Sequence, residues 1–178
     1  MNDKANGYGT YLHADGARYQ GFWVDDMKEG KGVEVWDDES EYQGNYKQGV
    51  KNGFGFYQWK NGSTYKGNWV SNKITGFGTY NWPDGRQFQG DWKDNFMHGR
   101  GVYTWKDGRK YEGDYLNDKK HGHGLYSWND GRQYEGSWVN GKQDGVGIQH
   151  DVDGTQRKGL WQNGKRIEWL EDTKNYST

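Results

Sequence analysis

Two histidines separated by one residue, His121 and His123, have the residue type and spacing that most directly suggest chemistry in this chain. A pair of imidazoles could hold a metal ion, but a zinc site usually takes three or four protein ligands, and the chain has no Cys to supply them. No second imidazole pair and no carboxylate cluster accompanies these residues. We therefore interpret both as polar residues of a link between two elements, and we predict no metal site and no cofactor.

A catalytic centre would need an acid and a base, or an activated nucleophile, in a pocket that excludes water. The carboxylates of this chain either alternate with apolar residues or fall in polar links, which is typical of solvated charges. Paired glycines such as Gly122 and Gly124 do not form a phosphate loop, because no GKS or GKT follows them, and the kinase signature motifs are absent. The sequence predicts a protein that is not an enzyme.

Aromatic side chains could provide binding instead of catalysis. They make up 17% of the chain, with 11 Trp and 14 Tyr, and they recur at fixed intervals. Exposed apolar patches usually mark a partner site, and aromatic anchors carry much of the binding energy there. Packing is an equally open role for the same rings. The predicted groove for a peptide or helix of a partner protein consists of Tyr57, Trp59, Tyr80, Trp82, Tyr103, Trp105, Tyr126 and Trp128.

Basic side chains in the links could meet an anionic membrane surface. Aspartates interleave with them, so a solvated rim of mixed charge is the preferred interpretation, with lipid binding as the alternative. The formal net charge is -1 and no continuous basic channel lies beside the rings, so nucleic acid is not an expected partner. The candidate lipid-facing residues are Arg86, Arg109, Lys110, Lys119, Lys120 and Arg132.

The composition limits the compartment and the type of core. Only 30% of the 178 residues are hydrophobic, too few for a thick core, yet the chain is too aromatic for disorder. It contains no apolar run long enough to span a membrane, and its first residues lack the features of a signal peptide. These properties predict a soluble cytoplasmic protein.

A repeat of 23 residues must position all of these side chains. Each repeat carries two glycines separated by one residue and a turn glycine, which is replaced once, by Glu39. No insertion or deletion interrupts the register, so every unit must stack on the next in the same way. The Y-x-G-x-W pattern starts at Tyr19, Tyr42, Tyr65, Phe88, Tyr111 and Tyr134, and in a degenerate form at Arg157.

Both segments of a repeat alternate as strands do. In YEGDY from Tyr111, and in GHGLYSW from Gly122 to Trp128, rings and glycines fall on every second residue and so share one face. The Asp-Gly link that follows favours positive backbone dihedrals and a tight hairpin, whereas the other link, LNDKKH, is expected to be longer. The fold class is therefore all-β: an elongated, single-layer antiparallel meander of about 15 strands built from hairpin repeats.

A single layer needs a core on its own surface. Glycine weakens a strand unless a neighbouring ring covers the bare backbone, so the glycines are expected to provide slots for rings. The opposite face is expected to be mostly solvated, with a thin apolar stripe that includes Phe54, Phe56 and Phe77. The rings expected to cover the glycines are Tyr19, Trp23, Tyr65, Trp69, Trp92, Tyr134 and Trp138.

The succession of Y-E-G-x-W, a polar link ending in H-G-x-G, Y-x-W and D-G resembles the MORN (membrane occupation and recognition nexus) repeat from Gly7 to Trp161. The resemblance implies a twisted single-layer sheet with an aromatic groove and a scaffold or docking role. Similar proteins occur in ciliary radial spokes and cytoskeletal rings, which implies a cytoskeletal or ciliary setting. The resemblance leaves open two alternative functions: a peripheral membrane tether that binds anionic phospholipids, and a regulatory module of a larger enzyme.

The two ends depart from the pattern. Residues 1–6 align with the middle of a unit and are expected to form a truncated repeat or tail, followed by the array over 7–161. A capping hairpin and tail are expected over 162–178. An edge strand offers unpaired backbone groups, and similar proteins associate tail to tail, which implies a homodimer through Ile167, Trp169 and Leu170.

Overall fold

The computed structural model describes residues 3–170, and within this range every regular element is a β-strand. Fifteen antiparallel strands form one open sheet whose strand order is the order along the chain. No helix occurs among the described residues, so none could cross a membrane there. The predicted all-β fold of hairpin repeats is confirmed.

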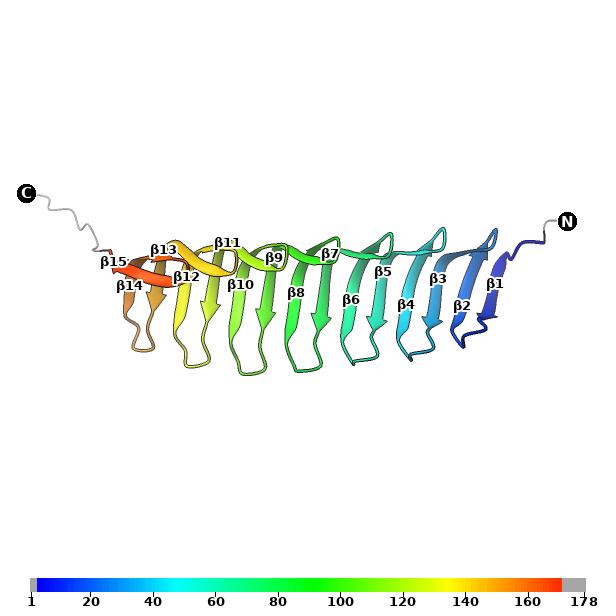
Figure 1. The fold of residues 1–178 in the computed structure, drawn as a ribbon, viewed down its shortest axis with the longest axis horizontal. Coiled ribbons are helices and arrows are strands. Elements are labelled where there is room, and N and C mark those ends of the chain that lie inside the picture. Colours follow the sequence, from blue (N-terminus) through cyan, green and yellow to red (C-terminus); the bar gives the residue numbers. More distant parts are fainter. Residues whose placement is uncertain (1–2, 171–178) are drawn as a thin grey trace, which may run out of the picture. The chain divides into compact units, whose positions relative to one another are not determined.

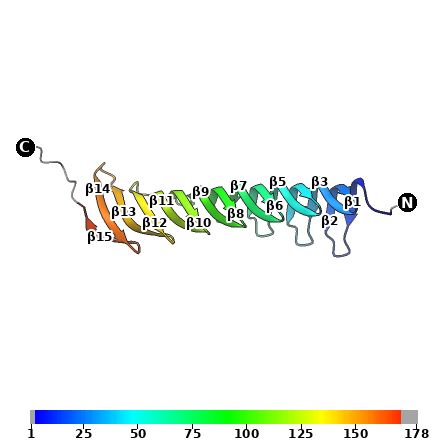
Figure 2. The same ribbon diagram turned by 90° about the horizontal axis from the view of Figure 1, so that it is seen from above.

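The chain divides into two compact units, residues 1–96 and residues 97–178, and within each the strands lie in one layer (Figures 1 and 2). The first unit contains β1 (Gly7–Leu12), β2 (Arg18–Val24), β3 (Met27–Val35), β4 (Glu41–Lys47), β5 (Val50–Gln58), β6 (Thr64–Val70), β7 (Lys73–Asn81) and β8 (Gln87–Lys93). The second contains β9 (Phe96–Thr104), which starts at the boundary, β10 (Lys110–Leu116), β11 (Lys119–Ser127), β12 (Gln133–Val139), β13 (Lys142–His150), β14 (Gln156–Gln162) and β15 (Lys165–Trp169).

A column of buried rings forms the core of each unit. Tyr65 is fully buried, and its ring covers Gly67 of its own strand and Gly78 of the next, where an added Cβ would lie 2.2 Å from the tyrosine hydroxyl. The hydroxyl donates a hydrogen bond to the carbonyl of Asn68 (3.2 Å), which satisfies its polar end. The predicted ring-over-glycine packing is confirmed for the tyrosines. The same column contains Tyr19, Tyr42, Phe88, Tyr111 and Tyr134, each at most 1% exposed.

Tryptophans complete this core. The ring of Trp92 meets the edge of Tyr65 at a centroid distance of 5.7 Å, and its indole N–H donates to the carbonyl of Gly78 (3.3 Å). Trp138 makes the equivalent contacts with Tyr111 (5.2 Å) and the carbonyl of Gly124 (3.1 Å). Edge-to-face contacts of this kind stabilise the fold by more than the burial of apolar area alone. Each tryptophan therefore stabilises the packing of one hairpin against the next.

The geometry of the two links is the reverse of the prediction. The link expected to be longer is a two-residue turn in which both residues have positive φ, as at Asn117 (48°) and Asp118 (65°). Such turns match the right-handed twist of paired strands, and Asn, Asp and Gly tolerate them best. At the Asp-Gly link, only the glycine has positive φ, for example Gly131 at 94°. The polar residues after the short turn, Lys119 to His121, already belong to β11.

The two glycines of each pair have different roles. Between β10 and β11 the register shifts at Gly113 and Asp114, and Gly122 adopts a φ of 63° in the bulge. Gly124 has no positive φ and lies beneath the ring of Tyr111. The expectation that Gly122 and Gly124 continue one alternating face is therefore wrong, because the bulge interrupts the alternation.

One turn carries a residue that is poorly suited to it. Glu39 has a φ of 68° at the place where the neighbouring repeat has Gly62 (84°). We expect Glu39→Gly to raise the free energy of unfolding by about 0.5–1 kcal/mol, since relief of the left-handed conformation (~1–2 kcal/mol) exceeds the extra entropy of the unfolded glycine. Urea unfolding measures the change. Gly62→Glu should produce a loss of similar size, and a destabilising Glu39→Gly would contradict the explanation.

Candidate partner-binding face

The face of the sheet that carries the buried tyrosines, here called the ring face, also carries a second series of rings. In the first unit Tyr57 contacts Trp59 at a centroid distance of 4.5 Å, and Tyr80 contacts Trp82 at 4.5 Å. Trp59 and Tyr80 are 5.1 Å apart, so the series continues from one repeat to the next. Trp36, which the sequence analysis left out, extends it by stacking on Tyr57 at 5.4 Å.

The second unit repeats the arrangement. Tyr103 lies 4.5 Å from Trp105, Trp105 lies 5.7 Å from Tyr126, and Tyr126 lies 4.9 Å from Trp128. The structure therefore brings the predicted groove residues of each unit into one series of touching rings.

The tyrosines of this series differ in exposure between the units, since Tyr57 and Tyr80 are half-buried. Tyr103 and Tyr126 are only 8% exposed and belong to the core, which favours packing for these two rings. The tryptophans Trp59, Trp82, Trp105 and Trp128 are half-buried, and each follows the end of its strand. We call these four, with Trp36, the tryptophan ladder.

The hairpin turn fixes each member of the ladder. The backbone N–H of Trp82 donates to the carbonyl of Arg86 (2.9 Å), and the N–H of Gly85 donates to the carbonyl of Trp82 (3.1 Å). The Arg86 guanidinium lies over the indole of Trp82 at 5.3 Å and pairs with Asp84 at 2.7 Å. A ring clamped in this way loses little freedom on binding, which favours its use as an anchor.

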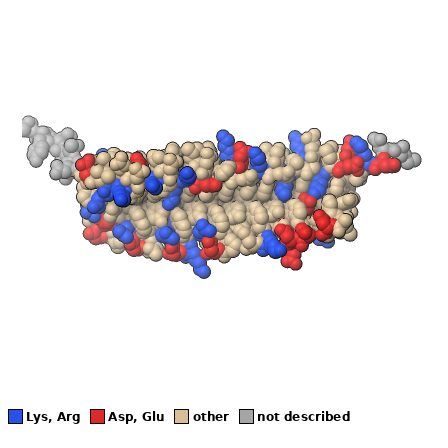
Figure 3. All heavy atoms as spheres, in the orientation of Figure 1, with Lys and Arg blue, Asp and Glu red and all other residues tan. Residues whose placement is uncertain are grey.

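The aspartate of the turn neutralises the arginine that the lipid alternative requires. Arg109 and Arg132 pair with Asp107 and Asp130 at 2.8 Å, and both guanidinium groups lie over ladder tryptophans. Figure 3 shows blue and red atoms side by side along the lower margin, where these turns lie. Hydrogen bonds from the Arg109 side chain, and then from its backbone, lower the pKa of Asp107, so the aspartate stays ionised.

The remaining candidate lipid-facing lysines differ from one another. Lys110 pairs with Glu112 at 2.8 Å, and Lys119 is exposed at the start of β11. Lys120 does not lie on the rim: its ammonium is surrounded by four rings, and its side chain is half-buried. The ring centroids lie at 4.4 Å for Tyr126, 4.9 Å for Trp138, 5.1 Å for Trp105 and 5.1 Å for Tyr111.

Burial costs the ammonium its hydration, and this desolvation, with a smaller effect of the Arg109 charge, lowers the pKa of Lys120 to about 8. The electron-rich faces of the rings partly replace the lost water. The aliphatic stem of Lys120 therefore fills the ring face, and the residue is unsuited to contact with a head group.

A column of residues on the strand directly after each tyrosine explains these contacts. Lys51 lies among Trp36, Tyr42, Tyr57 and Trp69, with centroids at 4.7–5.8 Å. The same position holds Ile74 and Met97 in other repeats, and Lys28 in an earlier one. The sequence analysis missed this column, although comparing Lys120 with Ile74 at the repeat spacing would have signalled a covered site.

Lys28 has different surroundings because a carboxylate replaces one ring. Glu34, 7% exposed, occupies the position that Tyr57 has in the next repeat. Lys28 donates to one of its oxygens, and the Tyr46 hydroxyl donates to the other at 2.8 Å. The charge of Lys28 is therefore compensated within the sheet.

The two histidines that suggested chemistry do not act together. His121 is partly buried and His123 is exposed, on either side of the bulge at Gly122. His121 occupies a column in which Glu29 and Asp144 accept hydrogen bonds from backbone N–H groups of later turns, both at 2.9 Å. Among residues 3–170 no group of three or more His, Cys, Asp or Glu side chains could hold a metal ion.

The predicted dimer edge does not form one exposed patch. Ile167 is 56% exposed, whereas Trp169 packs against Trp161 at 6.0 Å and lies beneath the guanidinium of Arg157 at 4.3 Å. The N–H of Leu170 donates to the carbonyl of Lys158 (2.9 Å). Leu170 and Trp169 therefore cap their own sheet, and a homodimer through this edge stays a prediction. Residues 171–178 of the predicted tail lie outside the described residues.

The repeat geometry agrees with a known family. Seven segments match the model of the MORN repeat: residues 1–18, 19–41, 42–64, 65–85, 88–108, 111–131 and 134–156. The chain belongs to the MORN-repeat family.

Solved structures resemble the fold at low sequence identity. The wild-type TCP10 domain of Danio rerio CPAP is 11% identical with a TM-score of 0.51, and the match covers 93% of this chain and 89% of that chain. A point variant of that domain is 12% identical with a TM-score of 0.50, covering 86% and 72%. These likenesses concern the sheet fold alone. No curated protein matches the sequence.

Proposed function

We propose that the protein is a non-catalytic scaffold whose ring face binds a segment of a partner protein. The observation that carries the proposal is the tryptophan ladder, a series of half-buried indoles held by hairpin turns in each unit. Tryptophan is among the residues most enriched at binding hot spots, and a pre-ordered ring loses little entropy on association. The family resemblance supports a cytoskeletal or ciliary setting for this scaffold.

The spacing of the ladder favours an extended ligand. Successive ladder residues, such as Trp59 and Trp82, are two strands apart, a distance of about 9.5 Å at the usual strand spacing. A polyproline II segment advances about 9.3 Å in three residues, so every third side chain would meet one indole. An α-helix advances about 5.4 Å per turn and does not keep this step. The proposed ligand is therefore an extended segment with apolar residues at every third position.

Lipid binding through the links has less support. The arginines of the predicted rim pair with aspartates of their own turns, and Lys120 lies among rings. A surface whose cations are already paired attracts an anionic bilayer weakly. The segment-binding scaffold is accordingly the proposal to test first.

Removing one ladder tryptophan should weaken partner binding. A partner captured by the purified chain and identified by mass spectrometry supplies tiled peptides for titration calorimetry. We expect Trp82→Ala to reduce the affinity of the bound peptide by about 2 kcal/mol, the scale of a hot-spot residue. Circular dichroism must show that the variant keeps its strands.

Phe77→Ala is the matched control, because Phe77 is 54% exposed on the other side of the same strand, β7. The control should leave the affinity unchanged. If a folded Trp82→Ala binds the peptide as tightly as the original chain, the ladder is not the binding site.

A further inference from the structure

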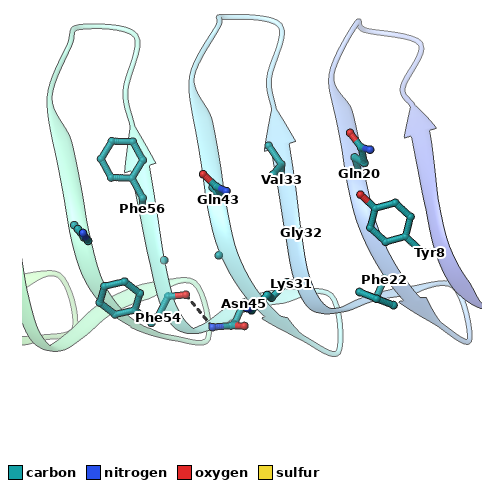
Figure 4. Close-up of a pocket in the computed structure, with 13 residues that line it drawn as sticks. Tyr8, Gln20, Phe22, Lys31, Gly32, Val33, Gln43, Asn45, Phe54 and Phe56 are labelled. Carbon is teal, nitrogen blue, oxygen red and sulfur yellow. Dashed lines mark hydrogen bonds between the residues drawn. The ribbon is translucent and has the colours of Figure 1, made fainter.

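The face opposite the ring face is hollowed in the first unit by a groove of about 620 Å³, shown in Figure 4. The sequence analysis expected this face to be mostly solvated. Two rows of side chains border the hollow, and backbone glycines, among them Gly44 and Gly55, lie between the rows. We call it the phenylalanine groove, after Phe22, Phe54 and Phe56, which line it.

The strand register defines both rows. One row runs across five strands through directly paired residues, which are Gln20, Val33, Gln43, Phe56 and Lys66. In the other row Tyr8 pairs with Phe22 and Lys31 pairs with Asn45, whose amide donates to the carbonyl of Phe54 (3.0 Å). The groove therefore runs across the strands, and a ligand lying in it would contact several hairpins.

Exposed apolar rings and exposed cations lie together in the groove. Phe22 and Phe54 are 50% and 52% exposed. Lys31 and Lys66 are exposed, and neither forms an ion pair with any residue in the described range 3–170. No carboxylate lines the hollow, in contrast to the turn arginines, which are each paired with an aspartate. Such a combination complements a ligand that is both acidic and apolar.

We propose that the phenylalanine groove binds an extended acidic peptide segment with an apolar residue between two carboxylates. Lys31 on β3 and Lys66 on β6 are three strand spacings apart, about 14 Å across the sheet, and their rows are two residues apart along the strands, so the two positions are separated by about 16 Å. An extended chain advances about 14 Å in four residues, and the long lysine side chains span the remainder. The carboxylates therefore fall four positions apart, and the side chain midway between them lies against Phe54. The amides of Gln20, Gln43 and Asn45 supply hydrogen bonds for the peptide backbone.

The corresponding face of the second unit has a different character. There Arg100 and His123 hold the repeat positions of Phe54, while Glu112, Asp114 and Glu135 bring carboxylates to this face. Glu112 pairs with Lys110 at 2.8 Å and Asp114 with Arg100 at 3.8 Å, so the cations beside these carboxylates attract an acidic segment less strongly, and we assign the groove to the first unit. A lipid surface is a poorer occupant, because a flat head-group layer does not reach a hollow between two rows of side chains.

The probe that tests the proposal is a fluorescein-labelled, capped peptide Asp-Ser-Phe-Thr-Asp, measured by fluorescence anisotropy. We expect it to bind the 178-residue chain, and we expect Lys31→Gln combined with Lys66→Gln to raise its Kd at least about tenfold. Phe54→Ala should raise the Kd as well. Lys93→Gln and Phe77→Ala, exposed residues of the same unit that do not line the groove, should leave it within about twofold.

Two further binding measurements test the charge requirement and the location of the site. A peptide with Lys in place of both Asp residues should not bind, and Trp82→Ala should leave the binding of the acidic peptide unchanged, which separates this site from the ring face. Equal binding of the two peptides, or binding that is indifferent to Lys31 and Lys66 in folded variants, overturns the proposal. The proposal is also overturned if the peptide does not bind and the protein instead sediments with phosphatidylserine vesicles only when both lysines are present.

Discussion

Replacing Gly78 with Ala should lower the free energy of unfolding by about 3 kcal/mol, the upper end of the usual cost of overpacking a core. The new methyl group would lie 2.2 Å from the Tyr65 hydroxyl and 2.5 Å from its ring carbon Cζ. The ring cannot yield easily, because Trp69 and Trp92 meet it edge-on at 5.4 Å and 5.7 Å. Urea unfolding followed by circular dichroism measures the loss.

Gly9 provides a matched control within the same column. It is the equivalent glycine of β1, and an added Cβ would approach nothing closer than Trp23 at 4.0 Å. Gly9→Ala should change the free energy of unfolding by less than about 0.5 kcal/mol, as is usual for a surface substitution. If both variants lose the same amount, the cost comes from the alanine in a strand and not from the displaced tyrosine.

The ring-over-glycine core could be predicted from sequence because a fixed period leaves little freedom. Rings and glycines on alternate residues share a face, and a bare glycine in a strand needs cover. The turns could not be predicted in the same way. The segment KKH after Asn117 and Asp118 was interpreted as part of a link because it is polar, yet these polar residues begin β11. The bulge at Gly122 then breaks the alternation on which the interpretation depended.

The candidate site, like the fold, could be predicted from the sequence only in part. The eight groove rings follow from the repeat, but the sequence does not show that Tyr103 and Tyr126 are buried while the other six rings are half-buried. The position of Lys120 was missed because a lysine beside Lys119 resembles any link cation, and only the apolar residues Ile74 and Met97 at the same repeat position indicate that the site is covered. The phenylalanine groove depends on cross-strand register, which no single segment reveals.

Alkaline pH should unfold the protein abruptly because the buried tyrosines cannot ionise in place. Burial raises the pKa of Tyr19 and Tyr134 to about 12, and it also raises the pKa values of Tyr42, Tyr65 and Tyr111, from an ordinary value of 10.0. Above pH 10 the unfolded chain releases protons that the folded chain retains. Stability is therefore fully present below pH 10 and is lost as the pH rises towards 12.

The size of this loss follows from the number of rings. Each tyrosine whose folded pKa lies near or above 12 contributes about 1.4 kcal/mol of destabilisation per pH unit between pH 10 and 12. The five rings named above remove about 7 kcal/mol per unit, and Tyr46 and Tyr115, whose pKa values burial also raises, add about 3 kcal/mol, which together is comparable with the whole stability of a typical domain. Lys120 and Lys51 act in the opposite direction, because burial lowers the pKa of both, but their stabilisation of the folded state stops increasing above the ordinary lysine pKa of 10.5. We expect the midpoint of unfolding near pH 11.

Phe88 supplies the control for this prediction, since it holds the tyrosine position of its repeat without a titratable group. Tyr65→Phe should reduce the slope of unfolding free energy against pH by about 1.4 kcal/mol per unit, and Phe88→Tyr should increase it by the same amount. At pH 7, Tyr65→Phe should cost about 1 kcal/mol, because the hydrogen bond to the carbonyl of Asn68 is lost. Urea unfolding at intervals from pH 8 to pH 11.5 measures all three slopes. Equal slopes for the three chains would show that alkaline unfolding has another origin, since the number of tyrosines in the column would then have no effect.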